Sequence, residues 1–282
     1  MLKNITDCVT LNNGVKMPYL GFGVFQVPEG DEVINSVRYA LKAGYRSIDT
    51  AWIYHNEEGV GTAIKESGIP REELFITTKV WNSHQGYDNT LAAFETSMKS
   101  LGLSYLDLYL IHWPGKTKYK ETWKALEKLY KEKRVRTIGV SNFKVHHLED
   151  LLSDCEVIPA LNQVECHPWL SQEELRSYCA EKGIQVEAWA PLAKSRSLDD
   201  ETIQSLASKH GRTPAQIILR WHLQNGIVII PKSVHEDRII ENSKVFDFSL
   251  SEEDMERINK LNCNKRTGSD PDTLTMGFES VK

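Results

Sequence analysis

The segment "DTAWIYHNEEG", residues 49–59, combines a carboxylate, two aromatic rings and a histidine between a short apolar run and a helix-like run. A phenol has a pKa of about 10 and is a weak proton donor at neutral pH. A neighbouring ammonium favours the phenolate and lowers that pKa, so a tyrosine beside a lysine can serve as a general acid. The chemistry that this segment suggests is proton donation by Tyr54, supported by Asp49.

Two further polar residues follow apolar runs elsewhere in the chain. Lys79 comes at the end of "LFITTK" and His112 at the end of "LDLYLIH". Lys79 could lower the pKa of Tyr54, Asp49 could hold the ammonium charged through a hydrogen bond, and His112 could orient a substrate oxygen. Each residue alone is better explained as a helix N-cap, a solvated lysine or a packing histidine. Their shared position at strand ends favours one catalytic set.

The elements that must position these residues alternate between strand and helix. Helix-like runs such as "GYDNTLAAFETSMKSLGL" and "KETWKALEKLYKEK" separate short apolar runs. About eight such runs are expected as parallel strands, the number that closes a barrel. They are "YLGFGVF", "RSID", "LFITTKV", "LDLYLIHW", "TIGVSN", "ALNQVEC", "QVEAWAP" and "GIVIIPKS". The carboxyl ends of such strands meet at one face, so the polar residues should surround one pocket.

Composition limits the class of protein. The chain has 282 residues and a net charge of −5, which argues against a surface for nucleic acid or anionic membranes. Its five cysteines are scattered without a CxxC pair, so neither a disulfide framework nor a cysteine zinc site is predicted. No signal peptide and no apolar run of about 20 residues is present. We expect one cytoplasmic domain over residues 1–282, with no nucleic-acid or membrane partner.

The motifs "GYRSIDTAWIYHNEEGVG", "LDLYLIHWP", "IGVSNF", "NQVECHP" and "IPKSVHEDRIIEN" resemble those of the aldo-keto reductases over nearly the whole chain. The similarity is greatest to small bacterial-type members that reduce glyoxal, methylglyoxal and keto sugars. It implies a (β/α)8 TIM barrel, an N-terminal β-hairpin closing the bottom and a C-terminal loop over the active site. It also implies a monomer with Tyr54 as proton donor, Lys79 and Asp49 in support, and His112 orienting a small-molecule carbonyl substrate.

The same resemblance implies an NADPH/NADP+ cofactor lying extended over the barrel mouth. Ser141, Asn142 and Gln163 would bind the carboxamide, and Trp189 would stack on the nicotinamide. Lys232 with Ser233 and Arg238 would suit a 2′-phosphate, whereas an amphipathic helix with solvated charges is the other explanation of that stretch. The full implied cofactor set is Gly23, Val24, Phe25, Asp49, Ser141, Asn142, Gln163, Trp189, Leu192, Lys232, Ser233, Val234, Arg238, Glu241 and Asn242.

Two stretches need separate interpretation. "GVGTAIKESG" lacks the third glycine of a Rossmann fingerprint and is better explained by close helix packing. After "AWAPL", many aldo-keto reductases carry glycines whose backbone approaches the cofactor pyrophosphate. Here residues 193–197 are "AKSRS", so the sequence does not indicate how this loop contacts the pyrophosphate. Aromatic side chains in the strand-end loops suit small or aryl aldehydes. The expected substrate-binding residues are Phe25, Trp52, Trp81, His112 and Trp113.

Two other classes of function remain as alternatives. The first is a cofactor-binding regulatory or structural member of the same fold with little needed activity, against which the complete catalytic set argues. The second is a metal-dependent hydrolase on the same barrel, which usually needs a His-x-His pair on an early strand. "YLGFGVF" has no histidine, and His146 and His147 fall on a helix, so no metal site is predicted.

Overall fold

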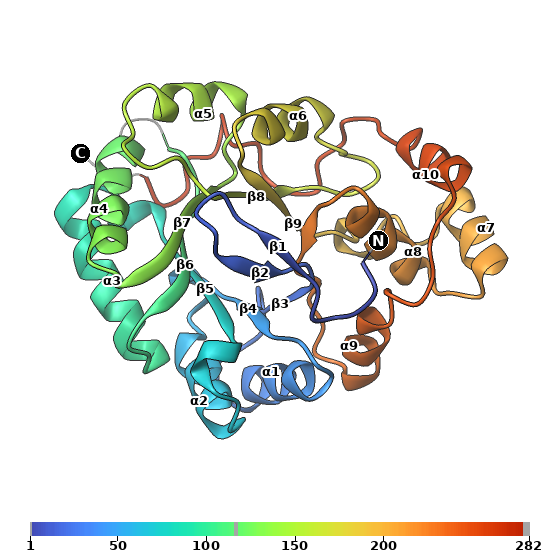
Figure 1. Cartoon of the computed structure of the whole chain (residues 1–282), viewed down its shortest axis with the longest axis horizontal. Helices are drawn as coiled ribbons and strands as arrows, with labels where there is room; N and C mark the ends of the chain where they lie inside the picture. Colours follow the sequence, from blue (N-terminus) through green and yellow to red (C-terminus); the bar gives the residue numbers. More distant parts are fainter. Residues whose placement is uncertain (1, 116–117, 279–282) are drawn as a thin grey trace.

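The computed structural model describes residues 2–115 and 118–278. Its centre is a sheet of eight parallel strands in the order β10-β9-β8-β7-β6-β5-β4-β3 (Figure 1). A parallel bridge between Leu20 and Ile229 joins the two edge strands, so the sheet closes into a barrel, as predicted. The strands are β3 (Gly21–Gly23), β4 (Ser47–Asp49), β5 (Phe75–Val80), β6 (Leu106–Ile111), β7 (Val135–Ser141), β8 (Leu161–Glu165), β9 (Gln185–Trp189) and β10 (Val228–Ile229).

Helices surround the barrel and connect its strands (Figure 1). Two of them, α7 and α8, lie between β9 and β10, and α9 and α10 follow the last strand. The helices are α1 (Asp31–Lys42), α2 (Glu57–Glu66), α3 (Tyr87–Leu101), α4 (Tyr119–Lys131), α5 (Val145–Leu152), α6 (Glu173–Glu181), α7 (Glu201–His210), α8 (Pro214–Gln224), α9 (Glu236–Ser243) and α10 (Glu252–Asn259). In α4, Trp123, Leu126 and Leu129 recur at helical spacing and are buried, which fixes the face that packs on the barrel.

The two glycines of "GVG" allow α2 to approach its neighbours closely. A Cβ atom on Gly61 would lie 2.2 Å from the carbonyl oxygen of Leu101, at the end of α3. A Cβ atom on Gly59 would lie 2.4 Å from Cγ1 of Val33 in α1. Both distances are far below contact distance, so the interpretation of this motif as close helix packing is confirmed.

The N-terminal hairpin closes the bottom of the barrel. Its strands are β1 (Cys8–Thr10) and β2 (Lys16–Pro18), which pair antiparallel. Leu11 and Met17 are buried in a separate apolar cluster formed with residues at the barrel's lower end, Phe75, Leu108, Leu110, Ala160, Leu161 and Val228. The side-chain amide of Asn12 donates to the carbonyl of Pro159 at 3.1 Å. With this end filled by side chains, the opposite end of the barrel is left for a ligand.

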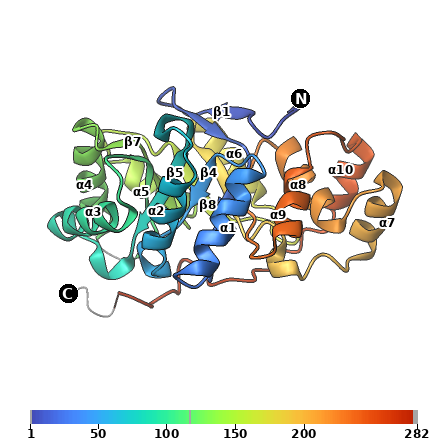
Figure 2. The same ribbon diagram turned by 90° about the horizontal axis from the view of Figure 1, so that it is seen from below.

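The C-terminal tail crosses that opposite end. Residues 264–278 contain no helix or strand and run beneath the barrel in Figure 2, on the face away from the N-terminus. The backbone amide of Lys265 donates to the carbonyl of Trp169 at 3.0 Å. Farther along, Asn82 donates its side-chain amide to the carbonyl of Met276 at 2.9 Å. The predicted loop over the mouth is therefore present. Within the described ranges, no helix has both the length and the apolar character needed to cross a bilayer.

Candidate active site

Tyr54 lies on a single 3-10 turn, Trp52–Tyr54, directly after β4. The buried side chain of Asn56 fixes the loop that carries this turn. Its Oδ1 accepts from Thr50 Oγ1 at 2.7 Å, and its Nδ2 donates to the carbonyls of Val24 and Val27 at 3.0 and 2.9 Å. The loop after β4 is thereby tied to the loop after β3, and the Tyr54 ring is held at the mouth beside the Phe25 ring, 5.0 Å away.

Lys79 and Asp49 form a buried ion pair at the ends of neighbouring strands. Lys79 Nζ lies 2.6 Å from Asp49 Oδ1 and donates to the carbonyl of Thr50 at 2.8 Å. The same Nζ lies 5.0 Å from the centre of the Tyr54 ring. Burial disfavours the ammonium, but the charges of Asp49 and Tyr54 outweigh this effect and raise the pKa of Lys79. Lys79 is therefore an ammonium at neutral pH, next to Tyr54.

The pKa of Tyr54 differs from the simple sequence expectation. Burial raises it, the charge and hydrogen bond of Lys79 lower it, and the charges of Asp49 and Glu187 raise it. Lys79 acts in the predicted direction, yet the net pKa is above the ordinary value because burial dominates. The expected effect of Lys79 is present, but burial outweighs it, and Tyr54 carries its proton at neutral pH.

His112 follows β6 and faces Tyr54. The two ring centres are 5.7 Å apart, and the Trp81 ring is 5.1 Å from the imidazole on another side. Burial, with a contribution from Lys79, lowers the pKa of His112 well below its usual range. The imidazole is therefore neutral. Its Nδ1 is buried without a hydrogen-bond partner among the described residues.

The residues expected at the nicotinamide carboxamide form one connected group. Asn142 adopts a left-handed φ of 66° and follows Ser141 at the end of β7. Its Nδ2 donates to the carbonyl of His112 at 2.9 Å, and its Oδ1 accepts from Trp189 Nε1 at 2.8 Å. Ser141 Oγ donates to the carbonyl of Gln163 at 2.8 Å. These bonds use the donors of the group, so acceptor oxygens remain for a carboxamide NH2.

Gln163 connects this group to a residue that the sequence analysis missed. Gln163 Nε2 donates to Asp49 Oδ2 and to Glu187 Oε2, both at 2.8 Å. Glu187 is buried, and burial followed by the charge of Asp49 raises its pKa to about 8. A glutamate two residues before Trp189 faces the same side of its strand, and that spacing is the signal that could have identified it.

The expected aromatic walls are at or near the mouth, with different degrees of burial. The side chain of Phe25 is 51% exposed, whereas Trp81 is buried. Trp52 is partly buried and packs against the His84 ring at 4.2 Å. Trp113 is also partly buried, and its carbonyl accepts from Gln85 Nε2 at 2.6 Å. Phe25 is thus the most accessible of the four.

The stretch expected to bind a 2′-phosphate lies after β10 and in α9. Lys232 and Arg238 are exposed, and neither side chain forms an ion pair with any residue that the structure describes. Ser233 is buried, and its Oγ accepts from the amide of His235 at 3.1 Å. Two unpaired cations and a hydroxyl fit a phosphate dianion.

The remaining members of the expected cofactor set differ in burial and in hydrogen-bond partners. Val234 and Leu192 are partly buried, and Asn242 is buried in α9. Glu241 accepts from Thr213 Oγ1 at 2.9 Å and so already has a partner within the protein. Gly23 and Val24 are buried at the end of β3. The Val24 amide donates to the carbonyl of Asp49 at 3.1 Å, which extends the pairing of β3 with β4 by one residue.

The loop without glycines adopts the conformation that glycines favour. Ala193, Lys194 and Ser195 have φ values of 49°, 55° and 66°, all in the left-handed region. This region costs a residue with a Cβ roughly 1–2 kcal/mol. Lys194 Nζ donates to the carbonyl of Thr267 at 2.8 Å and so ties this loop to the tail.

Glu165, a polar residue near a strand end for which the sequence indicated no role, holds the tail in place. Its buried carboxylate accepts from Thr267 N at 2.5 Å, from Thr267 Oγ1 at 2.7 Å and from Gly268 N at 3.2 Å. His167 Nε2 is 3.0 Å from the same Oε1. Burial opposes ionisation, but the hydrogen bonds from His167 and Thr267 lower the pKa of Glu165 to about 2. Gly268 lies against Trp189, where a Cβ atom would come within 2.4 Å of the indole.

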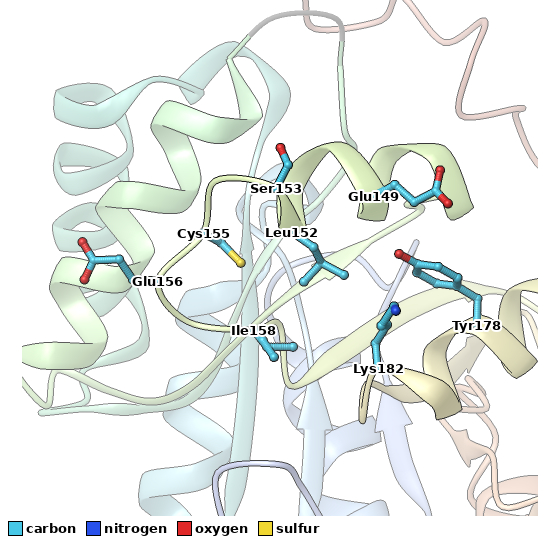
Figure 3. A pocket seen from close by; sticks show the side chains of 8 residues that line it. All are labelled: Glu149, Leu152, Ser153, Cys155, Glu156, Ile158, Tyr178 and Lys182. Atoms are coloured by element: carbon cyan, nitrogen blue, oxygen red, sulfur yellow. The ribbon is translucent and has the colours of Figure 1, made fainter.

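Two features lie outside this mouth. His146 and His147 are on α5 and approach Asp272, but His147 Nδ1 accepts from the Lys144 amide at 3.2 Å, which puts the proton on Nε2 and disfavours metal ligation there. An open hollow of about 610 Å³ between α5 and α6 is lined by none of the expected catalytic residues (Figure 3). Its lining residues are Glu149, Leu152, Ser153, Cys155, Glu156, Ile158, Tyr178 and Lys182.

Comparison with known proteins decides the family. The sequence profile of the Aldo/keto reductase family matches residues 19–263. The chain belongs to the aldo-keto reductases. It is 61% identical over 274 residues to a protein named glyoxal reductase from Bacillus subtilis (strain 168), covering 97% of this chain and 99% of the relative.

Further relatives agree in sequence and fold. The chain is 47% identical to methylglyoxal reductase DkgA from Escherichia coli (strain K12), over 94% of this chain and 96% of the relative. A crystal structure of a Gox0644 mutant in complex with NADPH superimposes with a TM-score of 0.91 at 47% identity, covering 95% of this chain and 98% of that one. The resemblance that the motifs indicated is confirmed.

Proposed function

We propose that this aldo-keto reductase uses NADPH to reduce small aldehydes and ketones, among them glyoxal, methylglyoxal, aryl aldehydes and keto sugars, to alcohols. The observation that carries the proposal is the convergence of Tyr54, Lys79, Asp49 and His112 at one barrel mouth, with Lys79 Nζ 2.6 Å from Asp49 and 5.0 Å from the Tyr54 ring centre. The names of the relatives, a glyoxal and a methylglyoxal reductase, support the substrate class.

The residues around the mouth fit NADPH in two chemically distinct places. Ser141 and Gln163 keep acceptor oxygens for the carboxamide, and Trp189 offers an indole face, which suits an aromatic ring. Lys232 and Arg238 offer unpaired cations for the 2′-phosphate, which NADH lacks. When bound, NADPH supplies the hydride that the substrate carbon accepts, since no side chain can do so.

The protein itself supplies a proton and orients the carbonyl oxygen of the substrate. As the carbonyl carbon gains a hydride, its oxygen gains negative charge and takes the proton of the Tyr54 hydroxyl. Lys79 stabilises the tyrosinate that this transfer leaves, and Asp49 keeps the ammonium in place. His112 is neutral and can donate one hydrogen bond to the same oxygen. Solvent then returns the proton to Tyr54.

The mouth also favours small substrates over bulky charged ones. The Phe25 and Tyr54 rings approach within 5.0 Å of each other, and Trp52, Trp81 and Trp113 are nearby on the strand-end loops. Aromatic walls with a few polar groups select compact apolar or aryl carbonyl compounds.

The decisive experiment is NADPH oxidation, followed at 340 nm, with glyoxal, methylglyoxal, aryl aldehydes and keto sugars as substrates. The wild-type protein should turn over several of them, and Tyr54→Phe should lose at least about 100-fold in kcat, the lower range for a lost general acid. NADPH affinity of the variant should stay within about twofold. Undiminished turnover by Tyr54→Phe would assign the acid to His112 or water, and no turnover by the wild type would favour a regulatory cofactor-binding protein.

We further propose a cytoplasmic monomer in which residues 1–282 form one domain. The support is that all five cysteines are free, as in a reducing compartment, and that one closed barrel contains the expected site. Size-exclusion chromatography with light scattering should give the mass of one chain, and a dimer mass would contradict the monomer.

A further inference from the structure

One amide nitrogen bridges two buried carboxylates beneath the mouth. In the strand register, Gln163 is opposite Glu187, and Gln163 Nε2 donates to Glu187 Oε2 and Asp49 Oδ2, each at 2.8 Å. Glu187 and Asp49 are both nearly fully buried. An amide nitrogen has two hydrogens, so both are used by these two acceptors. The orientation of the Gln163 side chain thus depends on Glu187 as much as on Asp49.

The bridge continues to the proton donor. The other carboxylate oxygen of Asp49 accepts from Lys79 Nζ at 2.6 Å, and this Nζ lies beneath the Tyr54 ring. The charged and titratable groups that act on Glu187 are Asp49 on β4 and Lys79 on β5, and its own charge acts on Tyr54. Glu187, Gln163, Asp49 and Lys79 therefore form one polar chain across four strands that ends at Tyr54.

We propose that Glu187 is a positioning residue for carbonyl reduction, which fixes Gln163 and Asp49 so that Lys79 stays beneath Tyr54. This inference rests on the proposed function of Tyr54 as the proton donor. The hydrogen bond that the Glu187 side chain accepts and the ionisation of that side chain give two separable effects to test.

The ionisation effect has a definite sign. Burial and the charge of Asp49 raise the pKa of Glu187 to about 8, so the ionised fraction of the side chain increases as pH rises from 7 to 9. An ionised Glu187 raises the pKa of Tyr54 and makes it a weaker acid. The turnover of the wild-type protein should therefore fall as pH rises through about 8, and the fall should disappear when position 187 cannot ionise.

Two variants separate the two effects. Glu187→Gln keeps an acceptor oxygen for Gln163 and cannot ionise, so its kcat at pH 7 should stay within about twofold of wild type and lack the inflection near pH 8. Glu187→Leu removes the acceptor, so its kcat at pH 7 should fall about tenfold, because misplacement of catalytic groups is costly, while KM changes little. It cannot ionise either, so its pH profile should also lack the inflection near pH 8. Glu127→Gln, a buried glutamate on the outer helix α4, is the matched control and should keep the wild-type pH profile.

Crystal structures of both variants give a readout that does not need activity. Glu187→Gln should keep the 2.6 Å contact between Lys79 Nζ and Asp49 Oδ1, and Glu187→Leu should lengthen or re-orient it. The proposal is overturned if the contact is unchanged in Glu187→Leu, or if the inflection near pH 8 persists in Glu187→Gln. Absence of carbonyl turnover in the wild type would instead remove the proposed function, and the crystal structures would still test the positioning.

Discussion

The residues expected at the nicotinamide, near Tyr54, and those expected at the 2′-phosphate, near Arg238, differ in how their polar groups are bonded. At the Tyr54 end, the polar groups are mostly bonded to one another inside the protein, from Glu187 through Gln163 and Asp49 to Lys79. At the Arg238 end, the guanidinium and the ammonium of Lys232 are exposed and unpaired within the described chain. The first end holds its geometry without a ligand, and the second offers charge that a ligand must satisfy.

This difference separates two kinds of contribution to function. Preorganised groups lower the barrier of the chemical step because they need no rearrangement when charge develops. Exposed cations contribute to ligand affinity and selectivity, with little effect on the chemical step. Variants at the two ends should accordingly change different kinetic constants.

The largest effect is expected from Lys79→Met. Removal of the ammonium leaves Tyr54 a weaker acid and Asp49 buried without its partner, so kcat should fall at least about 100-fold and the free energy of unfolding by roughly 3–5 kcal/mol. The alkaline limb of the rate profile should move to higher pH, because Lys79 lowers the pKa of Tyr54. Rate–pH profiles and urea unfolding measure the two effects. Lys128→Met, which removes an exposed partner of Glu132, is the control and should change neither.

Asp49→Asn sharpens the same test. Its loss of turnover should be smaller, because the amide can still accept from Lys79, and the two losses should not add in the double variant. The alkaline limb should move to lower pH, since the charge of Asp49 raises the pKa of Tyr54. Additive losses would give Asp49 an independent task.

At the exposed end, Arg238→Ala should weaken NADPH binding by about 1–3 kcal/mol, the range for a lost charged hydrogen bond. NADH affinity should be unchanged, and kcat at saturating NADPH should stay near wild type. Cofactor titration by intrinsic fluorescence gives both affinities. Arg38→Ala, which breaks an exposed pair with Glu66 on the outer helices, is the control. Equal losses for the two cofactors would place Arg238 away from the phosphate.

A smaller effect is expected at the tail. Glu165→Gln should lower the free energy of local opening at Thr267 and Gly268 by about 1.5 kcal/mol. The amides of these two residues should then exchange with deuterium roughly tenfold faster. Lys194→Met removes one bond to the same segment and should give a lesser increase. In the wild type, the pKa of Glu165 is depressed from 4.5 to about 2, so its stabilising contribution is fully present above about pH 4.5 and is lost as pH falls toward 2. Unchanged exchange in Glu165→Gln would mean that other contacts hold the tail.

The fold could be predicted from the sequence because each barrel strand is a short apolar run with its own helix-like neighbour. The eight expected runs correspond to β3–β10, and the hairpin turn at residues 12–14 joins β1 to β2. The positions of Asp49, Lys79 and His112 at strand ends then predicted that they lie together, since the carboxyl ends of all strands in a parallel barrel meet at one face.

The parts that could not be predicted depend on burial and on partners distant in sequence. Whether Tyr54 has a raised or lowered pKa depends on how much burial opposes the charge of Lys79. The sequence pattern does not give the relative size of these two effects. Glu165 and Glu187 look like ordinary strand residues until the tail and Gln163 are placed against them. The left-handed backbone of residues 193–195 could not be predicted either, because glycine is the residue that usually indicates such a conformation and none is present there.

The hairpin and the tail lie on opposite faces of the barrel (Figure 2). Chain added before the hairpin would extend from the sealed face, about the length of the strands away from the mouth. Chain added after the tail would start from a segment that already packs on Trp81 through Gly277. Affinity tags and fusion partners therefore belong at the N-terminus, and an immobilised protein attached by that end would present its mouth to the solution.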